Sequence, residues 1–183
     1  PVALVSATPS GNILALDNSG NILNSNGKAW QKLGGNLVQV SAGSDTEVWG
    51  VNANHAVFKW TGTTWQAMPG SLKQVAVAKG GGLVMGIEWA APNRVVRWDA
   101  ATNNWIALVG TPSLVQIAVG SPNHVFGVTA TGEIYKLKRP EWTEWRLIKG
   151  KLKQISVGQD GTVGGIGTDG NTYLRNDEDV TKE

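Results

Sequence analysis

Tryptophan is the chemically useful side chain that stands out in this sequence. The 183 residues include nine tryptophans, two histidines and no cysteine. Neither His55 nor His124 has the spacing of a metal-ligand motif, and turn or strand-edge positions explain both. An indole ring, in contrast, can stack on the apolar C–H face of a sugar while polar neighbours bond its hydroxyl groups. These residue types favour ligand binding over catalysis.

The carboxylates leave one catalytic alternative open. Glu141 and Glu144 lie close together in the segment KRPEWTEW, and two carboxylates can divide the acid and base roles of glycoside hydrolysis. The charged neighbours of this pair favour a solvated loop, and other acidic residues occur singly at turns. We therefore expect no enzymatic activity, no cofactor and no bound metal.

A repeated phrase reveals the elements that must position these side chains. It begins at Trp30, Trp65, Trp105 and Trp145, and reads WQKLGGNLVQVSAG, WQAMPGSLKQVAVA, WIALVGTPSLVQIAVG and WRLIKGKLKQISVG. The intervals are 35, 40 and 40 residues. Periods of this size are typical of solenoids, propellers and repeat arrays.

Each repeat divides into short runs that are rich in β-branched and aromatic residues and separated by turn residues, as in strands of a sheet. We divide one domain into five repeats of four strands each, at about residues 1–33, 34–69, 70–110, 111–149 and 150–183. The last outer strand, EDVTKE at 178–183, fits the pattern least well.

This pattern predicts an all-β fold, a β-propeller whose four-stranded antiparallel blades pack face to face around an axis. A small residue recurs in the middle of the second strand, where a large side chain would hold adjacent sheets apart. These residues are Ala15, Gly50, Gly86, Gly127 and Gly165. The alternative is an open β-solenoid, although solenoids use shorter periods and longer parallel stacks.

The motif W-x-x-L/I-x-G-x-L-x-Q-V/I-S/A-V/A-G, followed by V-W-G-V-N and V/I-F/Y-K, resembles the tectonin repeat over nearly the whole chain. Proteins of this family are β-propellers, and many are lectins of slime moulds, fungi and animals, including fish eggs. The resemblance implies recognition of microbial or nematode surface glycans, with O-methylated sugars or N-acetylglucosamine as ligands, and a role in innate defence. It also implies several similar sites between blades.

The sequence departs from the family pattern in two places. Compact tectonin lectins usually have six repeats, whereas five are visible here. The chain therefore forms either a closed five-bladed ring or an incomplete ring that associates with another copy as a homo-oligomer. In the last repeat, Gly164 replaces the aromatic residue of the second strand, which would remove a site there.

We expect the ligand-binding residues in the second strands and in the loops that follow them. They are Trp49, Asn52, Asn54, Glu88, Trp89, Arg94, Phe126, Thr129 and Glu133. Trp89 is out of phase with the repeat, and an exposed aromatic residue in a loop suggests a contact with a ligand or a neighbouring blade. Packing between blades is the simpler explanation for Trp49, and tight-turn geometry alone could explain the asparagines.

Charge and hydropathy restrict the partners and the location. The net charge is +2 without a basic run, which argues against nucleic acid. No apolar stretch approaches the ~20 residues of a membrane-spanning helix, and the start lacks the features of a signal peptide. Without cysteine, we expect a cytoplasmic or non-classically secreted protein.

We therefore favour two hypotheses of different classes over the glycosidase alternative. The leading one is a multivalent lectin with shallow sites between blades, whose avidity comes from several weak contacts. The other is a non-enzymatic propeller scaffold that binds proteins.

Overall fold

The computed structural model describes residues 2–138 and 142–176 and shows an all-β protein. The strands are β1 (Val2–Ala7), β2 (Ile13–Asp17), β3 (Ile22–Ser25), β4 (Trp30–Leu33), β5 (Gln39–Ala42), β6 (Val48–Val51), β7 (Ala56–Trp60), β8 (Trp65–Val77), β9 (Val84–Glu88), β10 (Val95–Asp99), β11 (Asn104–Ala107), β12 (Leu114–Ser121), β13 (His124–Thr129), β14 (Glu133–Leu137), β15 (Trp145–Val157), β16 (Val163–Gly167) and β17 (Thr172–Arg175). No helix long and apolar enough to cross a bilayer occurs among these residues.

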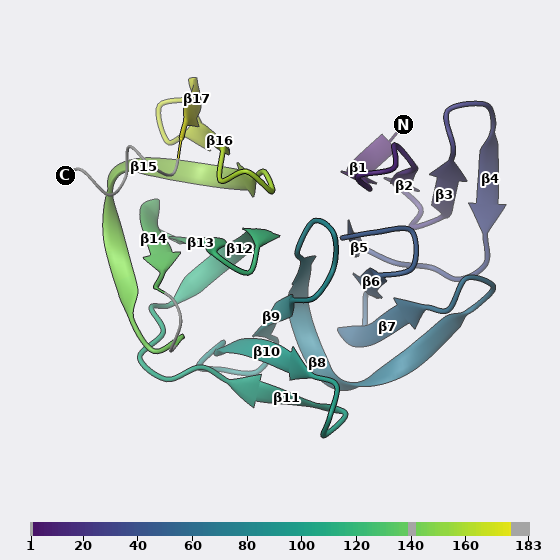
Figure 1. Ribbon diagram of the computed structural model, residues 1–183, viewed down its shortest axis with the longest axis horizontal. Coiled ribbons are helices and arrows are strands. Elements are labelled where there is room, and N and C mark those ends of the chain that lie inside the picture. The colour runs from purple at the N-terminus through teal and green to yellow at the C-terminus, as the bar shows by residue number, and fades with distance from the viewer. Residues whose placement is uncertain (1, 139–141, 177–183) are drawn as a thin grey trace.

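The described strands form five antiparallel sheets, which are blades of a β-propeller, the fold that the sequence predicts. Strands β1–β4 make blade 1, and β5–β7 with residues 65–71 of β8 make blade 2. Residues 72–77 of β8 begin blade 3, which continues through β9, β10 and β11. Figure 1 shows the blades in an arc around a common centre, with β1 and β2 at one end and β16 and β17 at the other.

Two long strands connect consecutive blades without a break. Like β8, strand β15 is the outer strand of one blade and the inner strand of the next: residues 145–151 complete blade 4 after β12–β14, and residues 152–157 begin blade 5 with β16 and β17. The fourth strand predicted for blade 5, at 178–183, lies outside the described residues.

The hydrophobic core lies between the blades rather than within any one of them. One buried cluster joins Leu14, Leu16 and Ile22 of blade 1 to Val40 and Val48 of blade 2, and three further clusters join the later pairs of blades in the same way. We call these four contacts joints 1 to 4, in chain order. Each blade therefore depends on its neighbours for the burial of its apolar faces.

The small residue in the middle of the second strand lies against a side chain of its own sheet, whereas the sequence pointed to the adjacent sheet. A Cβ atom at Gly86 would lie 2.6 Å from Cδ1 of Leu72, which belongs to the inner strand of the same blade. Gly50 and Gly127 meet Leu37 and Leu114 in the same way. The glycine thus makes room for a leucine of its own sheet, a partner that the sequence did not reveal.

A glutamine on the inner strand fastens each of three joints. The side-chain amide of Gln39 donates to the carbonyl of Val75 at 2.8 Å, and its oxygen accepts the N–H of the same residue at 3.0 Å. Gln74 makes the same pair of bonds to Ile117, and Gln116 to Ile155. The repeated Q-V/I motif therefore satisfies inner-strand backbone groups that no neighbouring strand pairs.

Lys79 ties the centre of the arc together. Its ammonium group donates to the carbonyls of Ala7 in blade 1, at 2.7 Å, and Ala42 in blade 2, at 2.8 Å, while its backbone N–H donates to Gly120 of blade 4. Burial lowers the pKa of this ammonium group. One side chain thereby links blades that are far apart in the sequence.

The last glutamine of the series has no counterpart to bind. Gln154 is exposed, and no hydrogen-bond partner for its amide lies within the part of the chain that the structure describes. Val5 of blade 1 is 59% exposed, whereas its equivalents Val40 and Val75 are buried against a preceding blade. The outer faces of blades 1 and 5 are thus not packed like the faces at the four joints.

We predict that the two glutamines Gln116 and Gln154 differ sharply in their contribution to stability. Gln116→Ala should lower the free energy of unfolding by about 1–3 kcal/mol, because it leaves two backbone groups of Ile155 without a partner. Gln154→Ala is the matched control and should change it by less than about 0.5 kcal/mol. Urea unfolding measures both, and equal effects would contradict the role assigned to this motif.

Candidate functional site

The candidate site lies on the surface, where the turn between β6 and β7 meets the loop between β9 and β10. The turn positions His55 at φ 64°, in a region that favours glycine, and the equivalent residues of other blades, Gly20 and Gly132, are glycines with positive φ. The carbonyl of His55 accepts the N–H of Leu72, as Gly20 accepts that of Leu37. His55 therefore keeps the backbone role of a glycine and adds an imidazole ring to the surface.

That imidazole ring stacks on Trp89. The ring centroids of His55 and Trp89 are 3.5 Å apart and the ring planes differ by 13°. The backbone N–H of Trp89 donates to the carbonyl of Ser71, which fixes the start of the loop. The indole ring remains 51% exposed, so it is held in one position and still available to a ligand.

Charged groups surround the exposed indole ring. Arg94 donates two hydrogen bonds to Glu88, from Nε at 2.6 Å and from Nη2 at 2.9 Å, and closes the loop that carries Trp89. The hydrogen bonds that Arg94 donates to Glu88, together with the negative charge of that carboxylate, raise the pKa of Arg94. The ammonium group of Lys73 lies 5.6 Å from the indole centroid. Aromatic, cationic and anionic groups thus meet on one surface, which we call the Trp89 site.

The predicted asparagines lie beside this site but have a structural role. The side-chain oxygen of Asn52 accepts the backbone N–H groups of Asn54 and Ala56, each at 3.0 Å. This geometry defines the turn that presents His55. Asn54 is exposed on the same turn, and its side chain makes no hydrogen bond to the described residues.

The remaining predicted residues do not join the Trp89 site. Trp49 is fully buried, lies against Trp98 and Trp105 at joint 2, and donates its indole N–H to Glu47 at 2.6 Å. Phe126 is buried at joint 4. Thr129 and Glu133 belong to the turn of blade 4, where the hydroxyl of Thr129 accepts the N–H of Glu133. The structure therefore brings together Asn52, Asn54, Glu88, Trp89 and Arg94.

The sequence reasoning missed His55, which it treated only as a turn or strand-edge residue. A signal was present, because the repeats align His55 with glycines in the corresponding turns of other blades. A histidine at such a position carries a conformational cost of order 1–3 kcal/mol, and the surrounding structure must compensate for it. Lys73 was missed as well. It is an ordinary polar residue of an inner strand, so the sequence gave no comparable signal.

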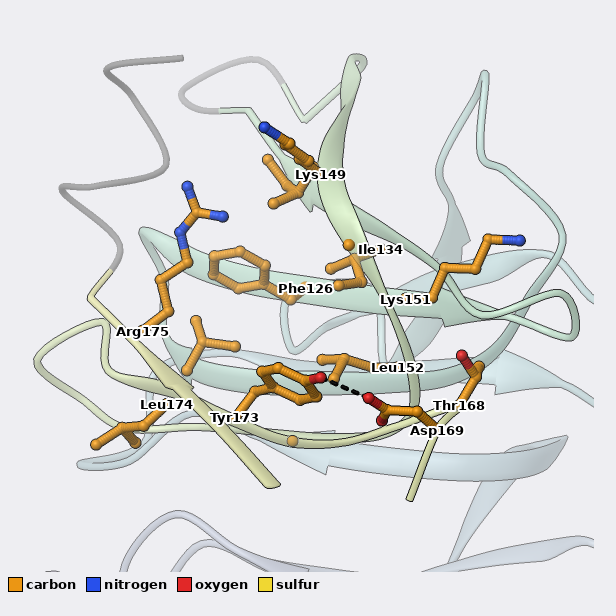
Figure 2. Close-up of a pocket in the computed structure, with 14 residues that line it drawn as sticks. Phe126, Ile134, Lys149, Lys151, Leu152, Thr168, Asp169, Tyr173, Leu174 and Arg175 are labelled. Carbon is orange, nitrogen blue, oxygen red and sulfur yellow. Dashed lines mark hydrogen bonds between the residues drawn. The ribbon is translucent and has the colours of Figure 1, made fainter. Parts of the chain in front are cut away.

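A second hollow, between blades 4 and 5, has a volume of about 440 Å³. Figure 2 shows its apolar wall of Phe126, Ile134 and Leu152, with Tyr173 across from them. The phenol of Tyr173 donates to Asp169 at 2.6 Å, and Asn171 donates to the same carboxylate. These two bonds lower the pKa of Asp169, and the carboxylate in turn raises that of Tyr173.

The strand pairing and the repeat define a β-propeller built from repeated blades. The sequence profile of the family described as "Tectonin domain" matches residues 1–183, and the chain belongs to this family. Tectonin-1 of Physarum polycephalum is 40% identical over 50 residues, which are 27% of this chain and 23% of that protein.

Solved structures share the fold at low sequence identity. Human WBSCR16 matches with a TM-score of 0.69 and 14% identity, and the match covers 94% of this chain and 61% of that one. YCF48 bound to D1 peptide matches at 0.66 and 17%, over 94% and 64%. Virginiamycin B lyase from Staphylococcus aureus matches at 0.63 and 14%, over 94% and 68%. The chain thus spans about three fifths of the first two proteins.

Across the described ranges, no three His, Cys, Asp or Glu side chains gather in a group that could hold a metal ion. Of the carboxylate pair considered for glycoside hydrolysis, Glu141 lies outside the described residues. Glu144 accepts a hydrogen bond from Lys138 at 2.9 Å.

Trp89 is exposed, whereas Trp105 of the repeat packs between blades. We therefore predict that replacing each with alanine lowers the free energy of unfolding by a different amount. Trp105 packs against Trp49 and Trp98 and donates its indole N–H to the carbonyl of Pro69 at 2.8 Å. Trp105→Ala should therefore reduce the free energy of unfolding by about 3 kcal/mol. Trp89→Ala should reduce it by less than about 1 kcal/mol, because the ring is half exposed. Chemical unfolding of both variants tests this, and a large loss in Trp89→Ala would make Trp89 a packing residue.

Proposed function

We propose that this protein is a lectin that binds cell-surface glycans at the Trp89 site. The observation that carries the proposal is the exposed indole ring of Trp89, which a stacked histidine holds in place among charged side chains. Membership of the tectonin family supports this reading. A sugar ring would place its C–H face against the indole ring, as apolar surfaces of this kind favour.

The polar groups at the site would select among sugars by their hydroxyl and amide substituents. Arg94 is exposed and retains donors beyond the two that it gives to Glu88, and Lys73 offers an exposed ammonium group. The exposed amide of Asn54 adds a donor and an acceptor on the neighbouring turn. Sugars with an O-methyl or N-acetyl group would add an apolar contact to these polar ones.

The proposal assigns one aromatic site to the described chain. The turns at 17–21, 52–56, 129–133 and 167–171 contain no aromatic residue other than His55, so Trp89 has no equivalent there. The sequence predicted several similar sites. A single weak site would depend on multivalent presentation for avidity, either through further propeller units or through association of chains.

The test is a glycan array, followed by calorimetric titration of the best ligand. The array would include O-methylated and N-acetylglucosamine-containing glycans as well as bacterial and nematode glycans. We expect binding, and we expect Trp89→Ala to weaken it by about tenfold or more, which corresponds to about 1.4 kcal/mol.

Trp30 provides a matched control for this test, because its side chain is 54% exposed on β4, away from the Trp89 site. Trp30→Ala should leave glycan affinity unchanged. No binding across the array, or equal losses in both variants, would contradict the proposal. Capture of a stoichiometric protein partner that free sugar does not displace would favour the scaffold alternative.

A further inference from the structure

Two cationic residues flank the strand that carries Trp89. Lys73 belongs to β8, Trp89 directly follows β9, and Arg94 directly precedes β10. Strand β9 lies between β8 and β10 in the sheet (Figure 1), so the two cationic residues stand on opposite sides of the strand end from which the indole ring projects. A ligand on Trp89 therefore meets positive charge from two different strands.

A β-bulge in β8 sets the direction of Lys73. Strand β8 pairs with β9 at Leu72 and again at Gln74, and the register shifts between these two residues, at Lys73. A bulge of this kind turns its side chain out of the regular alternation of the strand. The side chain of Lys73 is exposed, and its ammonium group lies 5.6 Å from the centroid of the Trp89 indole ring.

The same bulge recurs in other blades and carries different residues there. The inner strands of blades 1, 4 and 5 shift register at Ala3, Val115 and Lys153. Lys153 is exposed as well, but the turn at 167–171 in its blade contains no aromatic residue. Blade 5 thus offers a lysine at the same bulge position without an exposed tryptophan in the corresponding turn.

Both cationic side chains of the Trp89 site retain donors for an anion. Lys73 makes no hydrogen bond or ion pair with the described residues. Arg94 uses Nε and Nη2 for Glu88, and its Nη1 donors have no partner within the described ranges. Glu88 is the one acidic residue of the segments 52–56 and 88–94. The site therefore keeps a net positive charge.

A neutral sugar would leave this positive charge without compensation. His55 covers one face of the indole ring, so a sugar stacks on the other face and displaces water from the groups around it. Removing water from an unpaired ammonium group is costly unless an opposite charge takes its place. Carboxylate, sulfate and phosphate groups accept strong charge-assisted hydrogen bonds from ammonium and guanidinium donors.

We propose that the Trp89 site selects glycans that carry an anionic substituent. The indole ring holds the sugar ring, and the substituent accepts hydrogen bonds from the ammonium group of Lys73 and from the Nη1 donors of Arg94. Glu88 keeps the guanidinium group in position through its two hydrogen bonds. This inference rests on the proposed lectin function and names the class of ligand.

The test compares glycans in matched sets by calorimetric titration of the full chain. The sets are methyl glucoside with methyl glucuronide, and N-acetylglucosamine with its 6-sulfate and its 6-phosphate, so that carboxylate, sulfate and phosphate are distinguished. We expect an acidic member of at least one set to bind about tenfold more tightly than its neutral counterpart. Sodium chloride at about 1 M should remove most of this difference, because the screening length falls to about 3 Å.

Variants of the two bulge lysines assign the preference to the Trp89 site. Lys73→Glu should lower the ratio of acidic to neutral affinity by about tenfold, whereas Lys73→Arg, which keeps the charge, should preserve the ratio. Lys153→Glu is the matched control, because it makes the same change of charge at the same bulge position of blade 5. It should leave the ratio unchanged. Trp89→Ala should weaken the binding of acidic and neutral members alike.

The outcomes separate this inference from the proposed function. Binding of neutral glycans that equals or exceeds the binding of their acidic counterparts in every set overturns the anion preference and leaves the lectin function standing. A preference that survives Lys73→Glu, or that Lys153→Glu removes equally, also overturns it. No binding by any glycan, acidic or neutral, would overturn both proposals.

Discussion

The structure depends on the burial of each blade's apolar face against the next blade. A four-stranded sheet of this length cannot bury its own side chains, and the hydrophobic clusters accordingly lie at the joints between blades. The glutamines of the inner strands add hydrogen bonds across these joints, and Lys79 links blades 1, 2 and 4 at the centre. A repeated sequence suits this constraint, because every blade must offer the same two faces.

The candidate site arises where one repeat departs from the others. His55 replaces a glycine in one turn, and an insertion in the neighbouring blade carries Trp89 onto it. Neither change disturbs a joint, since the backbone of His55 still accepts the N–H of Leu72. Among the described residues, the joint between blades 4 and 5 also encloses a hollow of about 440 Å³. A regular scaffold thus leaves two different kinds of surface.

Much of the fold could be read from the sequence, because the repeat appears four times in phase and each copy carries the strand and turn residues of a blade. The small residue of the second strand was also recognised, although its partner is a leucine of the same sheet, such as Leu72 beside Gly86. Of the candidate site, Glu88, Trp89 and Arg94 were found from the loop that interrupts the repeat. Trp49 was grouped with them because its residue type alone does not reveal that three tryptophans enclose one another at joint 2.

The sequence by itself determined the all-β propeller fold and the repeated motif whose glutamine binds the next blade, because these depend on local patterns that recur. The tertiary structure alone decided which departures from the repeat meet. His55 and Trp89 are 34 positions apart, and their rings stack only because consecutive blades stand face to face. The same holds for the hollow at joint 4, because its lining residues come from two blades that only the tertiary structure brings together.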